Sequence, residues 1–484
     1  MPEVIPASSP DPHAGPSTNG APRVRTLTKV VHLGVAVIAL LVALVIGAHG
    51  YIDLDVYRAA SAALLHGHAL YGSLPNAPFD LKYIYPPFAA VLLAPLTVLP
   101  PGPMHVVWTL CTVTLVLGVL HVLMSRLGIR TAMMTPLLLL APALLLEPIR
   151  GTLGFGQINM VLVALVVADC TGVIPRRFRG VGIGIAAAIK ITPAAFGLLL
   201  LLRKDYSSAV RSASAFLLAA AIGGVFAPRD STLFWTQVFF DTNRAGAPWY
   251  GPNQAITGPL TRLGLTGTPE TLTWILGAVL IVGAATYAAW HFTRTGEHVA
   301  ALGVIALASL LSAPFAVSHH WSYVIILLPL LVAAQYRRWR YLLAIAAIVF
   351  LVGAQWYLPI GDERELHWTV LQQVVGDSEC LIGIAMLVGA VIAARSRAQV
   401  GAAPLTDVTA VEAGSVDATS AGASQRARFT TLPPVRAVRH PFLMYYGLCT
   451  SSPPPVMSTT ASPPWCVRSP GWNPTGGQRN AAAG

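Results

Sequence analysis

Charged residues are scarce in this sequence. They make up 11% of its 484 residues, while 55% of the residues are hydrophobic. A soluble globular protein carries about 25% charged residues, so the shortage excludes a soluble enzyme, a wholly disordered polymer and a nucleic-acid-binding domain. Acidic residues are the scarcest, at 20 against 31 Lys and Arg, and in a membrane chain such an excess of cations is typical of cytoplasmic loops. The composition predicts a polytopic helical membrane protein.

Cysteine is also rare and follows no pattern. The five cysteines form neither a Cys-x-x-Cys pair nor another spacing typical of a metal site. An odd, scattered set excludes a disulfide framework as the basis of the fold. We therefore expect no metal bound by cysteines, and we name no metal-ligating residues and no cofactor.

Long apolar segments fill the middle of the chain. A helix crosses a bilayer with about 17 to 25 apolar residues. The segments predicted to span lie at 31–49, 104–124, 131–147, 158–174, 208–227, 272–292, 299–317, 321–335, 341–358 and 380–394. Two more apolar segments are interrupted, 86–100 by prolines and 180–202 by Lys190 and Pro193. We predict an all-α transmembrane bundle of about 10 full spans plus two re-entrant or broken elements.

Positive charge sets the expected orientation. With a cytoplasmic N-terminus and no net crossing by either interrupted segment, the inner loops hold more than twice as many Arg and Lys as the outer loops. Counting 180–202 as a full span would invert every later loop. The expected organisation is a disordered cytoplasmic N-terminus (1–29), a transmembrane domain (30–395) and a disordered cytoplasmic tail (396–484) that is rich in Pro, Ser, Thr, Ala and Gly.

Several polar motifs then reach the outer face. Asp53 and Asp55 follow the first predicted span directly, ahead of a helix expected over 59–65. Partial burial at the mouth of a bundle raises the pKa of a carboxyl, which suits a general base acting on a sugar hydroxyl. A helix cap at the membrane surface is the alternative. Tyr83-Ile-Tyr-Pro-Pro-Phe88 indicates either interfacial anchors or a fixed turn beside a lipid-entry groove.

Amides and cations follow. Gln157 and Asn159 offer donors and acceptors for sugar hydroxyls, and the helix N-terminus behind them favours a phosphate. Arg150 adds a cation upstream, although a cap and a turn would explain the same residues. Lys190 interrupts an apolar run, and an intramembrane lysine is a functional hypothesis by default. Snorkelling to the interface is its alternative role.

Aromatic residues, histidines and acids mark the later outer loops. Trp249 lies in the longest of them, 228–271, where rings beside amides could stack on sugars or anchor the loop at the interface. His319 and His320 are adjacent, so on a helix at most one faces a given cavity. One of them is expected to contact a phosphate or hydroxyl. The acids at 362–379 are interpreted as loop residues that provide solubility.

The order of these motifs resembles a known family. The motifs are Asp53-Leu-Asp-Val-Tyr57, Leu70-Tyr71, Tyr85-Pro-Pro-Phe88, Gly156-Gln-Ile-Asn159, Lys190-Ile-Thr-Pro193 and Ser318-His-His-Trp321. Together, over roughly 30–395, they resemble the polyprenol-phosphate-mannose-dependent α-1,2-mannosyltransferases of mycobacteria, which are membrane glycosyltransferases of the GT-C fold.

The resemblance implies a reaction and a site. The reaction is inverting transfer of mannose from polyprenyl-phosphate-mannose to a glycolipid acceptor of the phosphatidylinositol mannoside, lipomannan or lipoarabinomannan type. It implies an α-1,2 linkage formed at the periplasmic face of the cell (inner) membrane. The family's catalytic aspartate maps to Asp53, with Asp55 left open. The residues predicted to bind the donor phosphate are Lys190, His319, His320 and Arg150, and those predicted to bind the sugar or acceptor are Tyr57, Tyr85, Gln157, Asn159 and Trp249. Asp53-Leu-Asp55 also matches the Asp-x-Asp of metal-dependent transferases, which leaves metal involvement open.

Two other functions are compatible with the sequence. A related transferase could use another polyprenyl-phosphate sugar, such as arabinose or glucose, or a protein acceptor. A lipid-linked-sugar flippase would place polar residues at mid-bilayer on several spans, whereas here they gather at one face. The expected partners are the lipid donor, the glycolipid acceptor and membrane lipids, with no nucleic acid; the sequence names no protein partner.

Overall fold

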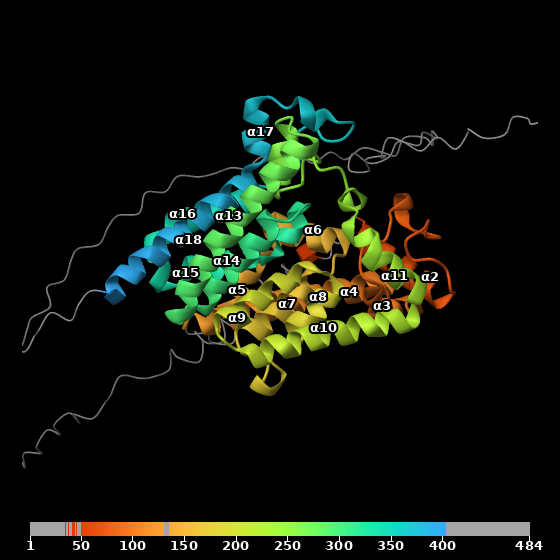
Figure 1. Cartoon of the computed structure of the whole chain (residues 1–484), viewed down its shortest axis with the longest axis horizontal. Helices are drawn as coiled ribbons and strands as arrows, with labels where there is room; N and C mark the ends of the chain where they lie inside the picture. The colour runs from red at the N-terminus through yellow and green to blue at the C-terminus, as the bar shows by residue number, and fades with distance from the viewer. Residues whose placement is uncertain are drawn as a thin grey trace, which may run out of the picture. The chain divides into compact units, whose positions relative to one another are not determined.

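The computed structural model describes residues 50–129 and 135–402, and before them the helical positions 34, 37, 41–43 and 45 (Figure 1). Within these residues the regular structure is helical, apart from one isolated antiparallel bridge between Asn253 and Val317. The all-α prediction is confirmed. The segment 1–29, most of the predicted span at 31–49 and the tail beyond 402 lie outside the described residues.

The α-helices have the following bounds. The first half contains α2 (Ile52–Leu65), α3 (Pro87–Leu93), α4 (Pro101–Arg126), α5 (Thr135–Leu145), α6 (Glu147–Phe155), α7 (Asn159–Cys170), α8 (Val181–Ile189), α9 (Gly197–Leu202) and α10 (Tyr206–Phe226). The second half contains α11 (Pro228–Thr236), α12 (Thr257–Arg262), α13 (Gly267–Arg294), α14 (His298–Leu311), α15 (Leu327–Val332), α16 (Arg340–Val352), α17 (Val370–Gly376) and α18 (Ser378–Ala402). Among the 3-10 helices, η2 (Ala94–Val98), η4 (Thr192–Phe196) and η7 (Ser318–Ile326) bear on the site.

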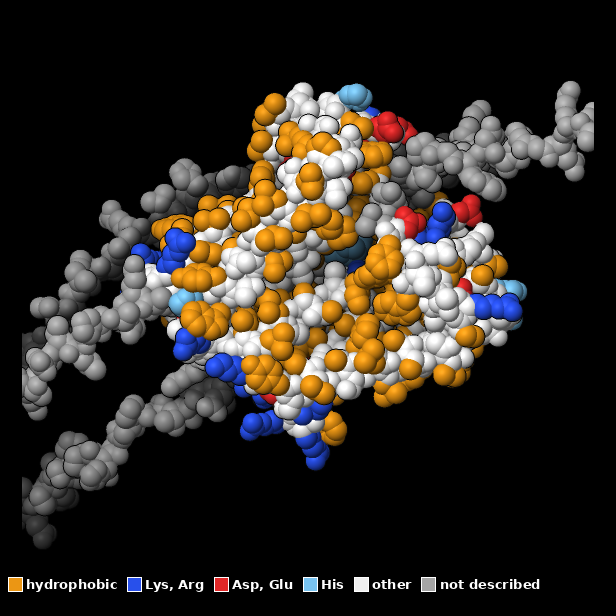
Figure 2. Space-filling model, viewed as in Figure 1, with side chains coloured by type: hydrophobic (Ala, Val, Ile, Leu, Met, Phe, Trp, Pro, Cys, Tyr) orange, Lys and Arg blue, Asp and Glu red, His pale blue; other side chains and the backbone are white. Residues whose placement is uncertain are grey.

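Length and composition make this a multi-pass membrane protein. Five described helical segments are long and apolar enough to cross a bilayer, or six if α5 and α6 count as one bent span. Some of these helices expose large apolar side chains, such as Leu218 on α10 and Leu276 on α13, which are 66% and 61% exposed. Apolar side chains also cover much of the face in Figure 2. Such faces suit lipid, and the predicted count of about 10 spans stays a prediction.

Both interrupted segments are broken in the structure. The segment 86–100 forms α3 and then η2, with prolines at the start of each. In 180–202, α8 ends at Ile189, Lys190 is extended (φ −149°, ψ 127°), and η4 then begins with Pro193 in its first turn. A proline is tolerated there because the first-turn N–H groups have no partner within the helix. The break leaves the half-buried Lys190 side chain next to Asn159 and the ring of Tyr85.

Three predicted elements differ in the structure. The span predicted at 131–147 ends as α5 at Leu145, and α6 starts at Glu147 after a bend of 76°, with a proline at its first positions. The span predicted at 321–335 is η7 followed by the short α15. The helix expected over 59–65 begins earlier, at Ile52, although it ends at Leu65 as predicted. The first two differences come from local breaks that a continuous apolar sequence does not reveal.

Candidate active site

Residues from five segments meet around the start of α2. Asp53 and Tyr57 lie on its first turns, Tyr85 precedes α3, and Gln157 lies between α6 and α7. Lys190 follows α8, and His319 lies on η7. Figure 2 shows a hollow near the centre of its face in which His and Lys or Arg side chains are visible. We call these six residues with Asn159 the Asp53 cluster.

A left-handed glycine brings two of these segments together. Gly156 ends α6 with φ 68°, a conformation that favours glycine. A Cβ at this position would lie 2.6 Å from the Cβ of Leu54 on α2. Only a residue without a side chain allows this approach, and it brings the next residue, Gln157, to the face of α2 that carries Asp53 and Tyr57.

Hydrogen bonds fix the orientation of Gln157. Its Oε1 accepts from the hydroxyls of Tyr57 (2.7 Å) and Tyr85 (3.2 Å). The Tyr57 hydroxyl also lies 3.0 Å from that of Tyr85. Because Oε1 accepts these bonds, the Gln157 Nε2 is left to donate, and it donates to Asp53. The same Gln157 nitrogen lies 3.4 Å from Nε2 of His319. One amide therefore links the carboxylate to the histidine.

The carboxyl of Asp53 has an altered acidity. Burial raises its pKa to about 6, against an opposing effect of the hydrogen bond from Gln157 and the charge of Lys190. A carboxyl with this pKa is ionised near neutral pH and is a stronger base than one in water.

Lys190 is oriented from two sides. Its ammonium lies 5.4 Å from the centre of the Tyr85 ring and donates to Oδ1 of Asn159 over 3.4 Å. Asn159 in turn donates to the backbone carbonyl of His319 over 2.9 Å. Among the described residues Lys190 forms no direct ion pair. Since an ammonium has three donors, it keeps capacity for an anion.

The two histidines are placed differently. Their rings are 4.7 Å apart and almost perpendicular. His319 is buried, packs its ring against Phe155 and approaches Gln157, while His320 is half-buried. His319 is therefore the histidine that reaches the Asp53 cluster.

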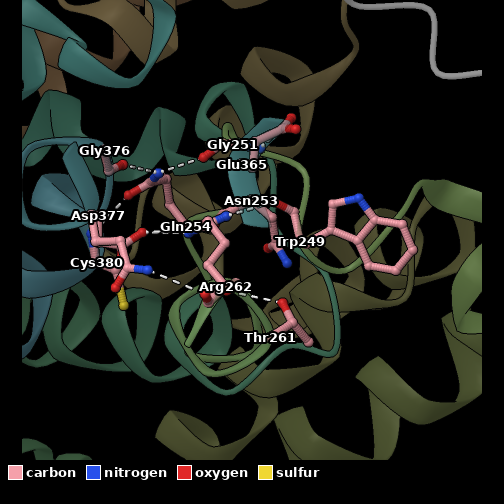
Figure 3. A network of polar contacts seen from close by, with 12 residues as sticks. Trp249, Gly251, Asn253, Gln254, Thr261, Arg262, Glu365, Gly376, Asp377 and Cys380 are labelled. Carbon is pink, nitrogen blue, oxygen red and sulfur yellow. Dashed lines mark hydrogen bonds and ion pairs between the residues drawn. The ribbon is translucent and has the colours of Figure 1, made fainter. Parts of the chain in front are cut away.

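Three of the predicted site residues have their contacts elsewhere. Asp55 pairs with His105 over 2.9 Å. Arg150 donates to the Leu145 carbonyl over 3.4 Å, and its charge acts on two buried glutamates. The backbone carbonyl of Trp249 accepts from Arg262, and Figure 3 shows its indole pointing away from that network.

The acidic cluster at 362–379 corrects the sequence interpretation. Asp362 and Glu363 are exposed, as loop residues that provide solubility should be. Glu365, Asp377 and Glu379, however, are only 1%, 5% and 0% exposed. The solubility interpretation is wrong for these three. The available signal was the position of Glu379 at the very start of an apolar span, where a charge is costly unless it has partners.

Comparison with known proteins places the chain in a family. The profile of glycosyltransferase family 87 matches residues 83–318. The chain is 32% identical over 386 residues to the polyprenol-phosphate-mannose-dependent alpha-(1-2)-phosphatidylinositol mannoside mannosyltransferase of Mycolicibacterium smegmatis, covering 74% of this chain and 87% of the relative. The protein of the same name from Mycobacterium tuberculosis is 33% identical over 370 residues, covering 72% and 86%.

A solved structure is more distant. The crystal structure of ArnT from Cupriavidus metallidurans bound to undecaprenyl phosphate aligns at 16% identity with a TM-score of 0.37, covering 78% of each chain. The membership therefore rests on sequence, through relatives that are matched over most of their length. The chain belongs to glycosyltransferase family 87.

Proposed function

We propose that this protein transfers mannose from polyprenyl-phosphate-mannose to a glycolipid of the phosphatidylinositol mannoside type. The proposal includes an α-1,2 linkage, inversion at the anomeric carbon, a GT-C fold, and a site that faces the periplasm from the inner membrane. The names of the relatives support the donor and the acceptor class. The observation that carries the proposal is the half-buried Asp53, which accepts a hydrogen bond from Gln157 and is close enough to Lys190 to be affected by its charge.

The residues divide the reaction between them. Asp53 takes the proton from an acceptor 2-hydroxyl, whose oxygen attacks the anomeric carbon from the face opposite the phosphate. The bond from that carbon to the phosphate oxygen breaks, and polyprenyl phosphate leaves with the electron pair. Lys190 and His319 stabilise the charge of the departing phosphate. The proton ends on Asp53, whose pKa of about 6 makes it an effective acceptor at neutral pH.

The remaining polar groups orient the reactants. The hydroxyls of Tyr57 and Tyr85 converge on Oε1 of Gln157, so they offer a ready surface for sugar hydroxyls next to the base. Asn159 positions Lys190 relative to the His319 backbone. Arg150 has no part in this scheme.

An apolar cavity that is lined in part by Ile191, the residue after Lys190, suits the lipid part of the donor. A cavity of about 560 Å³ is lined largely by small and aliphatic residues of α8, α9, α10 and α14, with Ile191 at one side. Ile191 directly follows Lys190. An isoprenoid chain in this cavity would hold its phosphate near the ammonium.

Mannose transfer by the purified protein tests the proposal. Radiolabelled polyprenyl-phosphate-mannose is incubated with phosphatidylinositol mannosides, and the labelled product is digested with a linkage-specific mannosidase. We expect Asp53→Asn to lower the rate by about 10²–10⁴-fold, and Asp55→Asn to stay near the wild-type rate because Asp55 pairs with His105.

Other outcomes separate the alternatives. Full activity in Asp53→Asn refutes the assigned base. Transfer only from polyprenyl-phosphate-arabinose would identify another sugar donor. Movement of intact lipid-linked sugar across a vesicle membrane, with no new glycosidic bond, would identify a flippase.

A further inference from the structure

Two buried carboxyl groups meet behind the Asp53 cluster. Glu147 starts α6 and Glu379 lies in the first turn of α18, with 3% and 0% of their surfaces exposed. They are 232 positions apart in the sequence, yet their carboxyl groups lie close enough to act on each other electrostatically. The scheme proposed for sugar transfer uses neither of them.

One oxygen of each carboxyl group has ordinary donors. Oε1 of Glu147 accepts from Ser318 Oγ over 2.9 Å and from Trp356 Nε1 over 2.6 Å. Oε1 of Glu379 accepts from Gln355 Nε2 over 3.0 Å. Both Oε2 atoms are buried, and no donor among the described residues serves either of them. These two atoms are therefore available to share a proton between the neighbouring carboxyl groups.

The proximity of the two carboxyl groups requires a proton. An ionised carboxylate can only accept hydrogen bonds, and two negative charges side by side within an apolar bundle repel strongly. One proton between the two Oε2 atoms satisfies both of them and leaves a single negative charge on the pair. Arg150 is the cation whose charge acts on both glutamates, and it balances that charge.

The pair is tied directly to the histidine of the site. Ser318, which donates to Glu147, immediately precedes His319. One turn further along α6, Gly151 lies so close that a Cβ there would be 3.2 Å from the Cβ of His319. The next residue, Thr152, donates to the His319 carbonyl over 3.3 Å. Helix α6 therefore holds the start of η7 at two successive residues.

We propose that Glu147 and Glu379 share one proton and that this pair, through Ser318, positions His319 for the phosphate of the lipid donor. Glu147 and Glu379 are then positioning residues that do not touch substrate. The inference rests on the proposed function only for the ligand of His319. The shared proton is argued from the burial of the two carboxyl groups and from their unpaired Oε2 atoms.

Steady-state kinetics test the positioning role. Glu147→Ala and Ser318→Ala both remove the hydrogen bond between Ser318 and Glu147 that joins η7 to α6. We therefore expect each to raise the KM for the lipid donor about tenfold, the cost of one lost hydrogen bond to a charged group. The KM for the acceptor should not change. Glu147→Gln keeps an oxygen for Ser318 and Trp356 and supplies an N–H in place of the proton, so it should retain the wild-type donor KM.

The kinetic outcomes are decisive in either direction. An unchanged donor KM in Ser318→Ala, with wild-type activity measurable, overturns the positioning role. The same holds if Glu147→Gln is impaired as much as Glu147→Ala. If Glu147→Ala does not fold, Ser318→Ala carries the test, because it leaves both carboxyl groups in place.

Infrared spectroscopy tests the shared proton without any substrate. Above the pKa of Asp53, at pH 8, the wild type should still show the C=O stretching band of a protonated carboxyl group. Glu147→Gln should lose it, because the amide then donates to Glu379 and leaves an ordinary carboxylate. A spectrum without this band in the wild type, or one that Glu147→Gln does not alter, refutes the shared proton. If the wild type transfers no sugar, the proposed function fails while this measurement still decides the proton.

Discussion

Two cations in the interior of this molecule, the buried Arg262 and the half-buried Lys190, have very different surroundings. Arg262, on α12, is 2% exposed, pairs with Asp377 and donates to the carbonyls of Trp249, Tyr250 and Asn253 over 2.9 to 3.2 Å (Figure 3). Lys190 has one long hydrogen bond of 3.4 Å and a ring beneath its ammonium. The first cation is fully coordinated by the protein, and the second is not.

The difference indicates which cluster is structural and which is a site. A buried charge is costly unless it is paired and hydrogen-bonded, and Arg262 meets both conditions with groups from two distant parts of the chain. It stabilises the loop before α12, whose Pro252 carbonyl accepts from the backbone N–H of Ser318 over 2.9 Å. Lys190 has no direct ion pair among the described residues. It is therefore suited to bind an anion reversibly, such as the phosphate of a lipid donor.

The largest expected effect comes from removing Arg262 from its network of hydrogen bonds with Asp377 and the backbone. Arg262→Gln removes one partner of a buried ion pair and leaves Asp377 buried without its cation, which costs about 3–5 kcal/mol. The variant should unfold at a clearly lower temperature in detergent, measured by the fluorescence of its tryptophans. Arg364→Gln is the matched control, since Arg364 is an exposed arginine whose ion-pair partner, Asp362, is also exposed. Equal melting temperatures for the two variants would contradict the structural role of Arg262.

The next largest effect is expected from a substitution at Lys190 in the Asp53 cluster. Lys190→Met removes the cation assigned to the departing phosphate, and losing one such stabilising group costs about 10²–10³ in rate. The thermal stability should not fall, because methionine replaces a charge that has no ion pair. Lys204→Met is the control, because Lys204 is an exposed lysine in the turn after α9, and this variant should transfer mannose normally. A Lys190→Met variant that melts early but keeps its turnover would reverse the roles assigned to the two clusters.

The sequence predicted the class and part of the site. Hydropathy alone predicted an all-α membrane protein, and Pro193 with Lys190 predicted the break after α8. The residues of the Asp53 cluster were all selected from the sequence, and the structure places them together. Their chemical roles remain proposals that the experiments above address.

The sequence could not predict which polar side chains contact each other. Asp53 and Asp55 are equivalent on the printed sequence, and only the packing shows that Asp55 pairs with His105 while Asp53 turns toward Gln157. Likewise Asp377 looks like a loop acid until Arg262, 115 positions away, is found beside it. Pairings over such separations depend on tertiary contacts, and no local pattern encodes them.

The smallest predicted effect concerns pH and sharpens the contrast within the site. A general base works only when ionised, so transfer should decline as pH falls through about 6, the pKa of Asp53. The hydrogen bond from Gln157 lowers that pKa, so Gln157→Leu should raise it and move the acid limb of the kcat/KM profile to higher pH. Asp55→Asn, which leaves Gln157 in place, should keep the limb at the wild-type position. Burial raises the pKa of Asp53, and the hydrogen bond from Gln157 opposes that rise. An acid limb that moves to lower pH in Gln157→Leu would therefore show that a different group titrates. Asp53 could then no longer be assigned as the base.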